Sequence, residues 1–195
     1  IGIFTAWAKL SYSKILIFVA NFYTTVIRGI PELLVIYLIF FGGSALVMKL
    51  AKIFGYNGYI ELNSLTISII AIGIISATYS SEVLRAAFLS IDKGQTEAAK
   101  TLGLSRIQIF FKILSPQILR YAIPGLGNVW QVTLKDTSLI SVTGLVEIMR
   151  QSYIAAGSTR DPLFFYSFAA VLYLFLTFLS MKMFNKLEKH YSKGY

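Results

Sequence analysis

Residues 92–116 read DKGQTEAAKTLGLSRIQIFFKILSP, and this stretch predicts two short helices that meet at an angle. We expect Thr96 to cap the first helix, because a threonine side chain accepts a hydrogen bond from an unpaired amide at a helix start. Gly103 is expected to end that helix, since glycine readily adopts the left-handed conformation that closes many helices. Ser105 and Gln108 have the spacing of a capping box, which opens the second helix.

This second helix is expected over residues 106–114, and Ser115 followed by Pro116 then caps a third, with proline at the first helical position. Together the two short helices predict a compact knob. We expect Ile107, Phe110 and Phe111 to anchor it below the rest of the protein. A plainer interpretation is a pair of amphipathic helices lying on a membrane surface.

The composition indicates a membrane protein. Of the 195 residues, 56% are hydrophobic and only 14% are charged, whereas soluble domains are about 25% charged. The net charge of +9 does not indicate nucleic-acid binding, because the cations flank apolar runs and form no continuous stripe. The absence of cysteine excludes disulfides and thiolate metal sites. The chain opens at Ile1, so we treat it as a possible fragment.

Four apolar stretches are long enough to cross a bilayer, which takes about 20 helical residues. They cover residues 30–48, 65–83, 123–146 and 163–183, and residues 1–8 have the composition of the tail of an earlier span. Cations gather in residues 85–120 and in the C-terminal tail, so the positive-inside bias places both in the cytoplasm. The loops at residues 49–63 and 150–162 then lie outside.

Glu97, Ala98 and Ala99, followed by Gly103, Ile113 and Pro116, resemble the EAA loop of ABC importer permeases. The spacing matches throughout, and only Ser115 departs from the usual leucine. In that family the loop docks into a groove on a separate ATP-hydrolysing subunit. The resemblance therefore implies that these six residues couple this chain to an ATPase.

Further segments resemble permeases for polar amino acids, with the closest similarity to those for arginine, histidine and opines. These segments are Arg28-Gly-Ile-Pro31, Tyr79 with Glu82 and Arg85, residues 124–128 and residues 134–139; Ala86 stands where that family usually has glycine. The resemblance implies an all-α transmembrane bundle of the type I (MetI-like) importer fold. It implies one permease domain over residues 1–195, with a cytoplasmic coupling loop at about 86–120. The full chain would then have five spans, the first largely missing here.

Two carboxylates are candidates for the substrate pathway. A charged side chain costs roughly 2.5–3.5 kcal/mol at the centre of a span, so Asp136 should face other helices or a water-filled cavity. It can contact substrate or serve as a structural hydrogen-bond anchor, while the adjacent Lys135 can pair with another carboxylate. Glu147, near the external end, can attract a cationic amino acid or form a surface pair with Arg150.

Other residues are candidates for structure or gating. Glu82 and Arg85 are three residues apart and are expected to pair at the inner boundary. Arg28 and Pro31 mark a break between a helix and a span, although Arg28 can also be a simple positive-inside anchor. After Pro124, two glycines can allow close helix approach or bending; these are Gly125 and Gly127. His190, in the cationic tail, is expected to be solvated.

The sequence contains no phosphate-binding loop, metal-ligand spacing or nucleophile elbow, so it predicts a non-catalytic subunit with no cofactor of its own. ATP and magnesium would be bound by a partner ATPase. The other expected partners are a second permease subunit (identical or homologous), an extracytoplasmic amino acid-binding protein and membrane lipid, but no nucleic acid. The expected location is the bacterial cytoplasmic (inner) membrane, crossed several times.

The main alternative function is a secondary amino acid transporter driven by an ion gradient, for which inverted repeats are expected and none is evident. An intramembrane enzyme would have to use Ser138 and His190, which lie far apart in the sequence.

Overall fold

The computed structural model describes residues 1–56, 58 and 63–192, and every regular element in these ranges is helical. In chain order they are α1 (Gly2–Lys9), α2 (Lys14–Gly29), α3 (Glu32–Tyr37), a π-helical turn (Leu38–Gly42), α4 (Gly43–Ile53), α5 (Ser64–Leu89), α6 (Lys93–Thr101), α7 (Arg106–Ile109), a second π-helical turn (Phe110–Leu114), α8 (Ser115–Asp136), a 3-10 helix (Thr137–Thr143), α9 (Ile148–Thr159) and α10 (Pro162–Ser192). The predicted all-helical architecture is therefore observed throughout the described residues.

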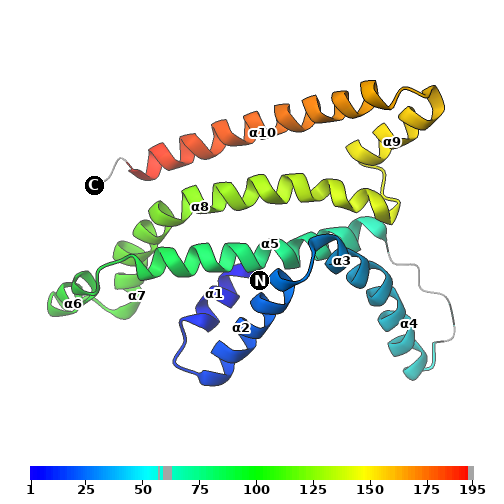
Figure 1. Ribbon diagram of the computed structural model, residues 1–195. Helices are drawn as coiled ribbons and strands as arrows, with labels where there is room; N and C mark the ends of the chain where they lie inside the picture. Colours follow the sequence, from blue (N-terminus) through cyan, green and yellow to red (C-terminus); the bar gives the residue numbers. More distant parts are fainter. Residues whose placement is uncertain (57, 59–62, 193–195) are drawn as a thin grey trace.

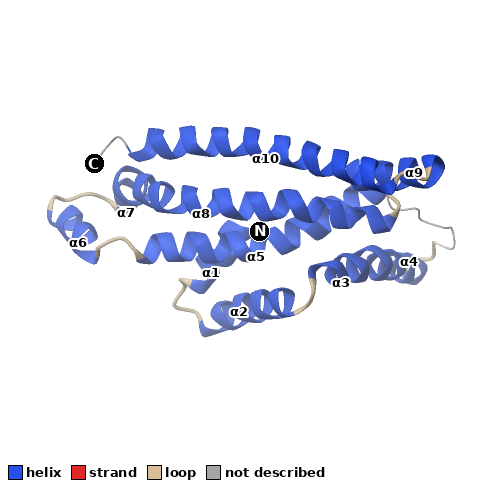
Figure 2. Ribbon diagram, turned by 45° about the horizontal axis from the view of Figure 1, so that its top comes forward, coloured by secondary structure: helices blue, strands red, loops and turns tan. Residues whose placement is uncertain are grey.

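Three long helices, α5, α8 and α10, run side by side, with α8 in the middle (Figures 1 and 2). The N-terminal helices α1 and α2 and the α3–α4 segment lie on the other side of α5. At one end of the bundle α6 and α7 project near the C-terminal end of α10, and α9 lies at the opposite end. The predicted cytoplasmic loop and cytoplasmic tail thus share one end, as the threading of the spans requires.

Helix α5 packs on α1, α2, α3 and α8 because small side chains occupy much of its buried surface. Helices in membranes associate closely through such residues. Its buried side chains include Ala71, Ala77, Thr78 and Ser81. Val35 and Ile36 of α3 pack against Ala71 and form the buried cluster that joins the two helices.

Among the residues that the structure describes, three segments are long and apolar enough to cross a membrane: Glu32–Ile53, Ser64–Leu89 and Pro162–Ser192. They correspond to three of the four predicted spans, each longer than expected. The predicted span over residues 123–146 is wrong in extent, because α8 begins at Ser115 and ends at Asp136, and a 3-10 helix follows. The predicted outer loop over residues 150–162 is mostly helix α9.

The outer loop between the first two spans was expected over residues 49–63. Its first part is helical, because α4 continues to Ile53. Gly55 then adopts a φ of +85° and turns the chain away from the helix. Asn57 and residues 59–62 lie outside the described residues.

Candidate functional site

The knob predicted from residues 92–116 is present, but its caps differ in part. Asp92, not Thr96, caps α6, and its carboxylate accepts a hydrogen bond from the Gly94 amide at 2.8 Å. The predicted cap is wrong because the chain offers two good capping residues four positions apart, and the earlier one begins the helix. Gly103 has a φ of +78° and ends the first helix as expected. The Ser105–Gln108 capping box is also confirmed.

Helix α8 begins at Ser115 with Pro116 in its first turn, as predicted, but Ser115 makes no side-chain cap and α8 is not separate from the helix before it. The chain stays helical from Arg106 to Asp136, and a π-helical turn at Phe110–Leu114 joins α7 to α8. Pro116 lacks an amide hydrogen, so it fits near this change of hydrogen-bond pattern without interrupting the helix. The second helix of the knob, α7, is consequently continuous with the long helix α8.

The anchors of the knob also differ from the prediction. Ile107 is 71% exposed and Phe111 is 66% exposed, with Phe110 also exposed, whereas Ile109 is buried. The expected apolar anchors therefore face outward. A side-chain hydrogen bond from Gln117 of α8 to Gln95 of α6 ties the knob to the bundle, and Ala99 is buried beneath it.

The residues predicted from the sequence to couple the chain to an ATPase lie in this knob. Glu97 and Ala98 are exposed on α6, whereas Ala99 is buried. Ile113 lies in the π-helical turn, where its carbonyl accepts a hydrogen bond from Gln117 at 3.0 Å. Nearby, the Leu102 side chain is 80% exposed. The knob therefore presents a small, accessible surface at the end of the bundle.

A second cluster of polar groups lies where α2 stops and α3 starts, at the break predicted from Arg28 and Pro31. The Tyr79 hydroxyl of α5 donates a hydrogen bond to the Glu32 carboxylate at 3.0 Å. The Arg28 guanidinium stacks on the Tyr79 ring, 5.2 Å from its centroid. The carboxyl group of Asp136, at the end of α8, lies close enough to Glu32 for the two groups to interact electrostatically. Side chains from four helices, α2, α3, α5 and α8, thus meet in one group of charges.

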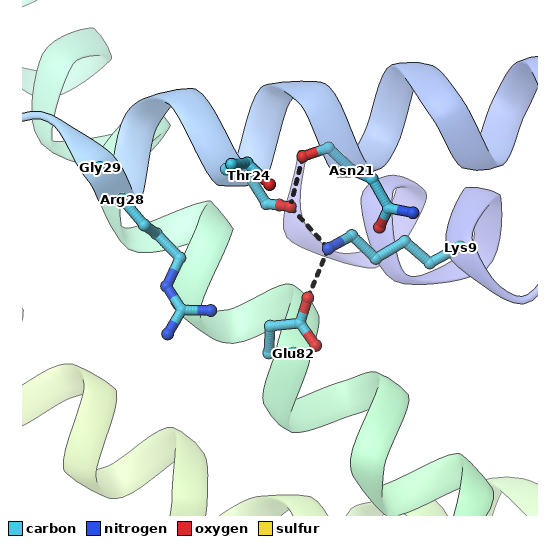
Figure 3. Close-up of a pocket in the computed structure, with 7 residues that line it drawn as sticks. Lys9, Asn21, Thr24, Arg28, Gly29 and Glu82 are labelled. Atoms are coloured by element: carbon cyan, nitrogen blue, oxygen red, sulfur yellow. Dashed lines mark hydrogen bonds and ion pairs between the residues drawn. The ribbon is translucent and has the colours of Figure 1, made fainter.

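Towards the knob from this cluster, a polar pocket of about 420 Å³ opens between α1, α2 and α5. Figure 3 shows Lys9 extending to Glu82 and to the Thr24 hydroxyl, with Arg28 on the facing side. The Lys9 side chain is only 6% exposed, and it forms an ion pair with Glu82. The pocket is lined by Lys9, Asn21, Thr24, Thr25, Arg28, Gly29 and Glu82.

The predicted pair of Glu82 with Arg85 is confirmed, with Nε of Arg85 2.9 Å from the carboxylate. Lys9 is an additional partner of the same carboxylate. Glu82 therefore links α1 to α5 and also neutralises the charge of Arg85 on its own helix.

Glu147 precedes α9, at the end of the bundle opposite the knob. Its carboxylate caps α9 by accepting hydrogen bonds from the Met149 and Arg150 amides at 2.8 and 2.6 Å. The Tyr173 hydroxyl of α10 donates a third, at 3.2 Å. Within the described part of the chain, the expected ion pair with the Arg150 side chain is not formed; that guanidinium lies over the Tyr153 ring. A role for Glu147 in attracting substrate stays a prediction.

The two glycines after Pro124 mark close helix contacts. A methyl group added at Gly125 would lie 2.6 Å from Cγ1 of Val83 on α5, and one at Gly127 would lie 3.1 Å from the Phe184 ring on α10. Both positions therefore allow α8 to pack closely on its two long neighbours.

The model of the family described as "binding-protein-dependent transport system inner membrane component" matches residues 1–193. The chain belongs to this family. It is 46% identical over 193 residues to the octopine transport system permease protein of Rhizobium radiobacter, covering 99% of this chain and 81% of the relative. It is 38% identical over 194 residues to the histidine/lysine/arginine/ornithine transport system permease protein of Escherichia coli, covering 100% and 85%.

A solved structure shares the fold of this permease. It is described as an amino acid ABC transporter with histidines, and it matches with a TM-score of 0.79 and 31% identity, covering 97% of this chain and 83% of that one. The resemblance to ABC importer permeases and the predicted importer fold are thus confirmed.

Sequence reasoning missed three features of the permease. Lys9 was not among the predicted site residues, although it is buried against Glu82. Glu32 was not among them either, although it contacts Tyr79. The polar face of α2 that includes Asn21 was not noticed. A charge inside an apolar run was the available signal for Glu32, because such residues face other polar groups.

Proposed function

We propose that this permease forms one half of the membrane pathway of an importer for basic amino acids or related opines. A separate ATPase, docked on the α6 knob, supplies the energy. The relatives named for octopine and for histidine, lysine, arginine and ornithine support this substrate class. These compounds combine a carboxylate with a nitrogen-rich side chain that carries or can gain positive charge.

The observation that carries the proposal is the continuous connection between the knob and the charged cluster. Gln95 on α6 bonds to Gln117 near the start of α8, and α8 ends at Asp136 beside Glu32. A helix of 22 residues is stiff and spans about 33 Å. Movement of the knob would therefore be transmitted along α8 to the carboxylates.

In this mechanism the ATPase binds the exposed surface around Glu97 and Ala98, and a second permease subunit closes the other side of the pathway. An extracytoplasmic binding protein delivers the amino acid. ATP binding brings two ATPase subunits together, swings both knobs and opens the cavity outward, and hydrolysis resets it. Asp136, with Glu32, would attract the cationic group of the substrate in the pathway, and Glu147 would attract it at the outer end. ATP and magnesium stay on the ATPase.

Deleting residues 97–103 tests the docking of the ATPase. The deletion removes the exposed part of α6 and the left-handed Gly103 but leaves α5 and α8 whole. We expect normal insertion into the membrane and loss of ATPase capture in a pull-down from detergent.

A matched pair of charge reversals sharpens this test. Glu97→Lys should weaken ATPase capture, whereas Glu188→Lys should not, because Glu188 is an exposed carboxylate on α10 outside the knob. Equal capture by the wild type, the deletion and both reversals would show that the ATPase docks elsewhere.

A further inference from the structure

The polar pocket between α1, α2 and α5, called the inner pocket below, contains three charged side chains, and Arg28 is the one whose charge is not neutralised by a bonded partner. Lys9 and Glu82 neutralise each other in an ion pair, and Arg85 is a second cation bonded to Glu82. Among the described residues, the Arg28 guanidinium forms no hydrogen bond or ion pair and only stacks on Tyr79. Its donors therefore remain available to an anion, and a guanidinium suits a carboxylate because two parallel N–H groups match two oxygens.

The helix that carries Arg28 presents a polar face to the same pocket. Asn21, Thr25 and Arg28 are spaced by four and three residues, so they share one face of α2, and all three are exposed. Phe18 and Phe22, also exposed, supply apolar surface on the same helix. Exposing an arginine to lipid is costly, so the polar face should line water. The pocket volume of about 420 Å³ is within the range of small-molecule sites.

The Tyr79 ring separates this free cation from a pair of carboxylates. The Arg28 guanidinium lies over the face of the ring. The Tyr79 hydroxyl donates a hydrogen bond to Glu32, which lies beside Asp136. Positive charge therefore lies on the knob side of Tyr79 and negative charge on the other side. A ligand that matches both needs an anionic and a cationic end.

We propose that Arg28 is a substrate-binding residue that holds the α-carboxylate of a basic amino acid in the inner pocket, while the cationic side chain points to Glu32 and Asp136. This assignment rests on the proposed import of basic amino acids and adds the orientation of the substrate. It also gives Tyr79 a role, as the surface on which the middle of the ligand packs. The order of charges then selects arginine over compounds that lack either end.

The test measures binding to the purified permease, in complex with its ATPase and second permease subunit in nanodiscs, without the binding protein. Labelled arginine is competed with agmatine, which lacks the carboxylate, and with norvaline, which lacks the guanidinium. The wild type should prefer arginine over both. Arg28→Gln should weaken arginine binding roughly 10- to 100-fold, since hydrogen bonds to charged groups contribute about 1.5–3 kcal/mol, and should change agmatine binding less than about twofold.

Two further variants complete the comparison. Glu32→Gln should weaken arginine and agmatine alike and leave norvaline unchanged. Lys186→Gln, an exposed cation on α10, should change none of the three. If Arg28→Gln fails to insert, Arg28→Lys takes its place, because it keeps the charge but loses the paired donors. Arg28→Lys should reduce the preference for arginine over agmatine by several-fold.

The pattern of losses decides the outcome. If Arg28→Gln weakens the binding of arginine and of agmatine equally, the assignment is overturned. An unchanged preference for arginine over agmatine in Arg28→Lys would overturn it too. Either result would leave the proposed import intact and indicate that Arg28 serves another anion, such as a lipid phosphate or a carboxylate of the second permease subunit. If the wild type binds none of the three compounds, yet Glu97→Lys still abolishes ATPase capture, the substrate class itself is wrong.

Discussion

At the scale of single residues, Glu82 is the charge on which the N-terminal helices depend most. It is bonded to Lys9 of α1 and to Arg85 of its own helix. Lys9 is nearly buried, and an unpaired buried charge is strongly destabilising. The contact joins residues 73 positions apart in the sequence, so it fixes α1 against α5.

Glu82→Gln should therefore lower the thermal stability of the permease. Loss of one partner from a buried ion pair costs roughly 3–5 kcal/mol, and we expect the lower end because the Glu82 side chain is 26% exposed. Thermal unfolding in detergent, followed by circular dichroism, measures the change. The control Glu188→Gln should leave the melting temperature unchanged, and adding Lys9→Met to Glu82→Gln should restore part of the loss. An unchanged melting temperature in Glu82→Gln would contradict the assigned role.

At the scale of elements, the packing of α8 on α5 depends on the absence of a side chain at Gly125. Val83 occupies the space that a methyl group would need. Gly125→Ala should destabilise the protein by about 1–3 kcal/mol, the usual cost of overpacking. Val83→Ala in the same chain should recover most of this loss.

Gly157→Ala is the matched control for this packing, because nothing lies within 4 Å of a methyl group at that position. Alanine there should be neutral or slightly stabilising, since it favours the helix. Thermal unfolding of the wild type and these three variants provides the comparison. Similar losses from Gly125→Ala and Gly157→Ala would mean that helix propensity, rather than contact with Val83, explains the effect.

The hydrogen bond between α6 and α8 leads to a second prediction at the scale of elements. Gln117→Leu removes the hydrogen bond to Gln95 but leaves the exposed surface of α6 intact. ATPase capture should persist, while stimulation of ATP hydrolysis by the loaded binding protein should fall about fivefold, the equivalent of about 1 kcal/mol. The control is Gln151→Leu, an exposed position on α9. Unchanged stimulation in Gln117→Leu would show that this bond does not transmit movement.

The features that sequence predicts well are local. Gly103 and the Ser105–Gln108 capping box were found because a few neighbouring residues determine a helix end. The Glu82–Arg85 pair was found for the same reason. Thr96 was chosen wrongly as a cap because Asp92 competes for the same role within one turn. The π-helical turn at Phe110–Leu114 has no distinct periodicity, so it was not expected.

Contacts between distant segments were beyond local patterns. Glu32 meets Tyr79 across 47 positions in the sequence, and no pattern in either helix encodes their approach. Charges inside apolar spans indicated that such contacts should exist, because isolated charges are costly there. Which charges meet depends on the packing of α2, α3, α5 and α8, and this required the three-dimensional arrangement.

At the scale of the whole molecule, charge and apolar surface are arranged as a membrane pathway requires. In the most apolar part of the long helix α10, only 6% of the residues are buried, and many phenylalanine and leucine side chains of this helix are exposed. This face is suited to lipid or to another membrane helix. The polar groups gather instead between α1, α2, α5 and α8. The knob lies at one end of the molecule (Figure 1).

The central claim is that this permease forms an amino acid pathway driven by a separate ATPase through the α6 knob. The most direct measurement is uptake of labelled arginine by vesicles that contain the permease, its second subunit and the binding protein, with and without the ATPase. We predict ATP-dependent uptake that requires the ATPase, disappears when residues 97–103 are deleted and survives collapse of the proton gradient. Uptake that persists without the ATPase and is lost with the proton gradient would contradict the account and favour a secondary transporter.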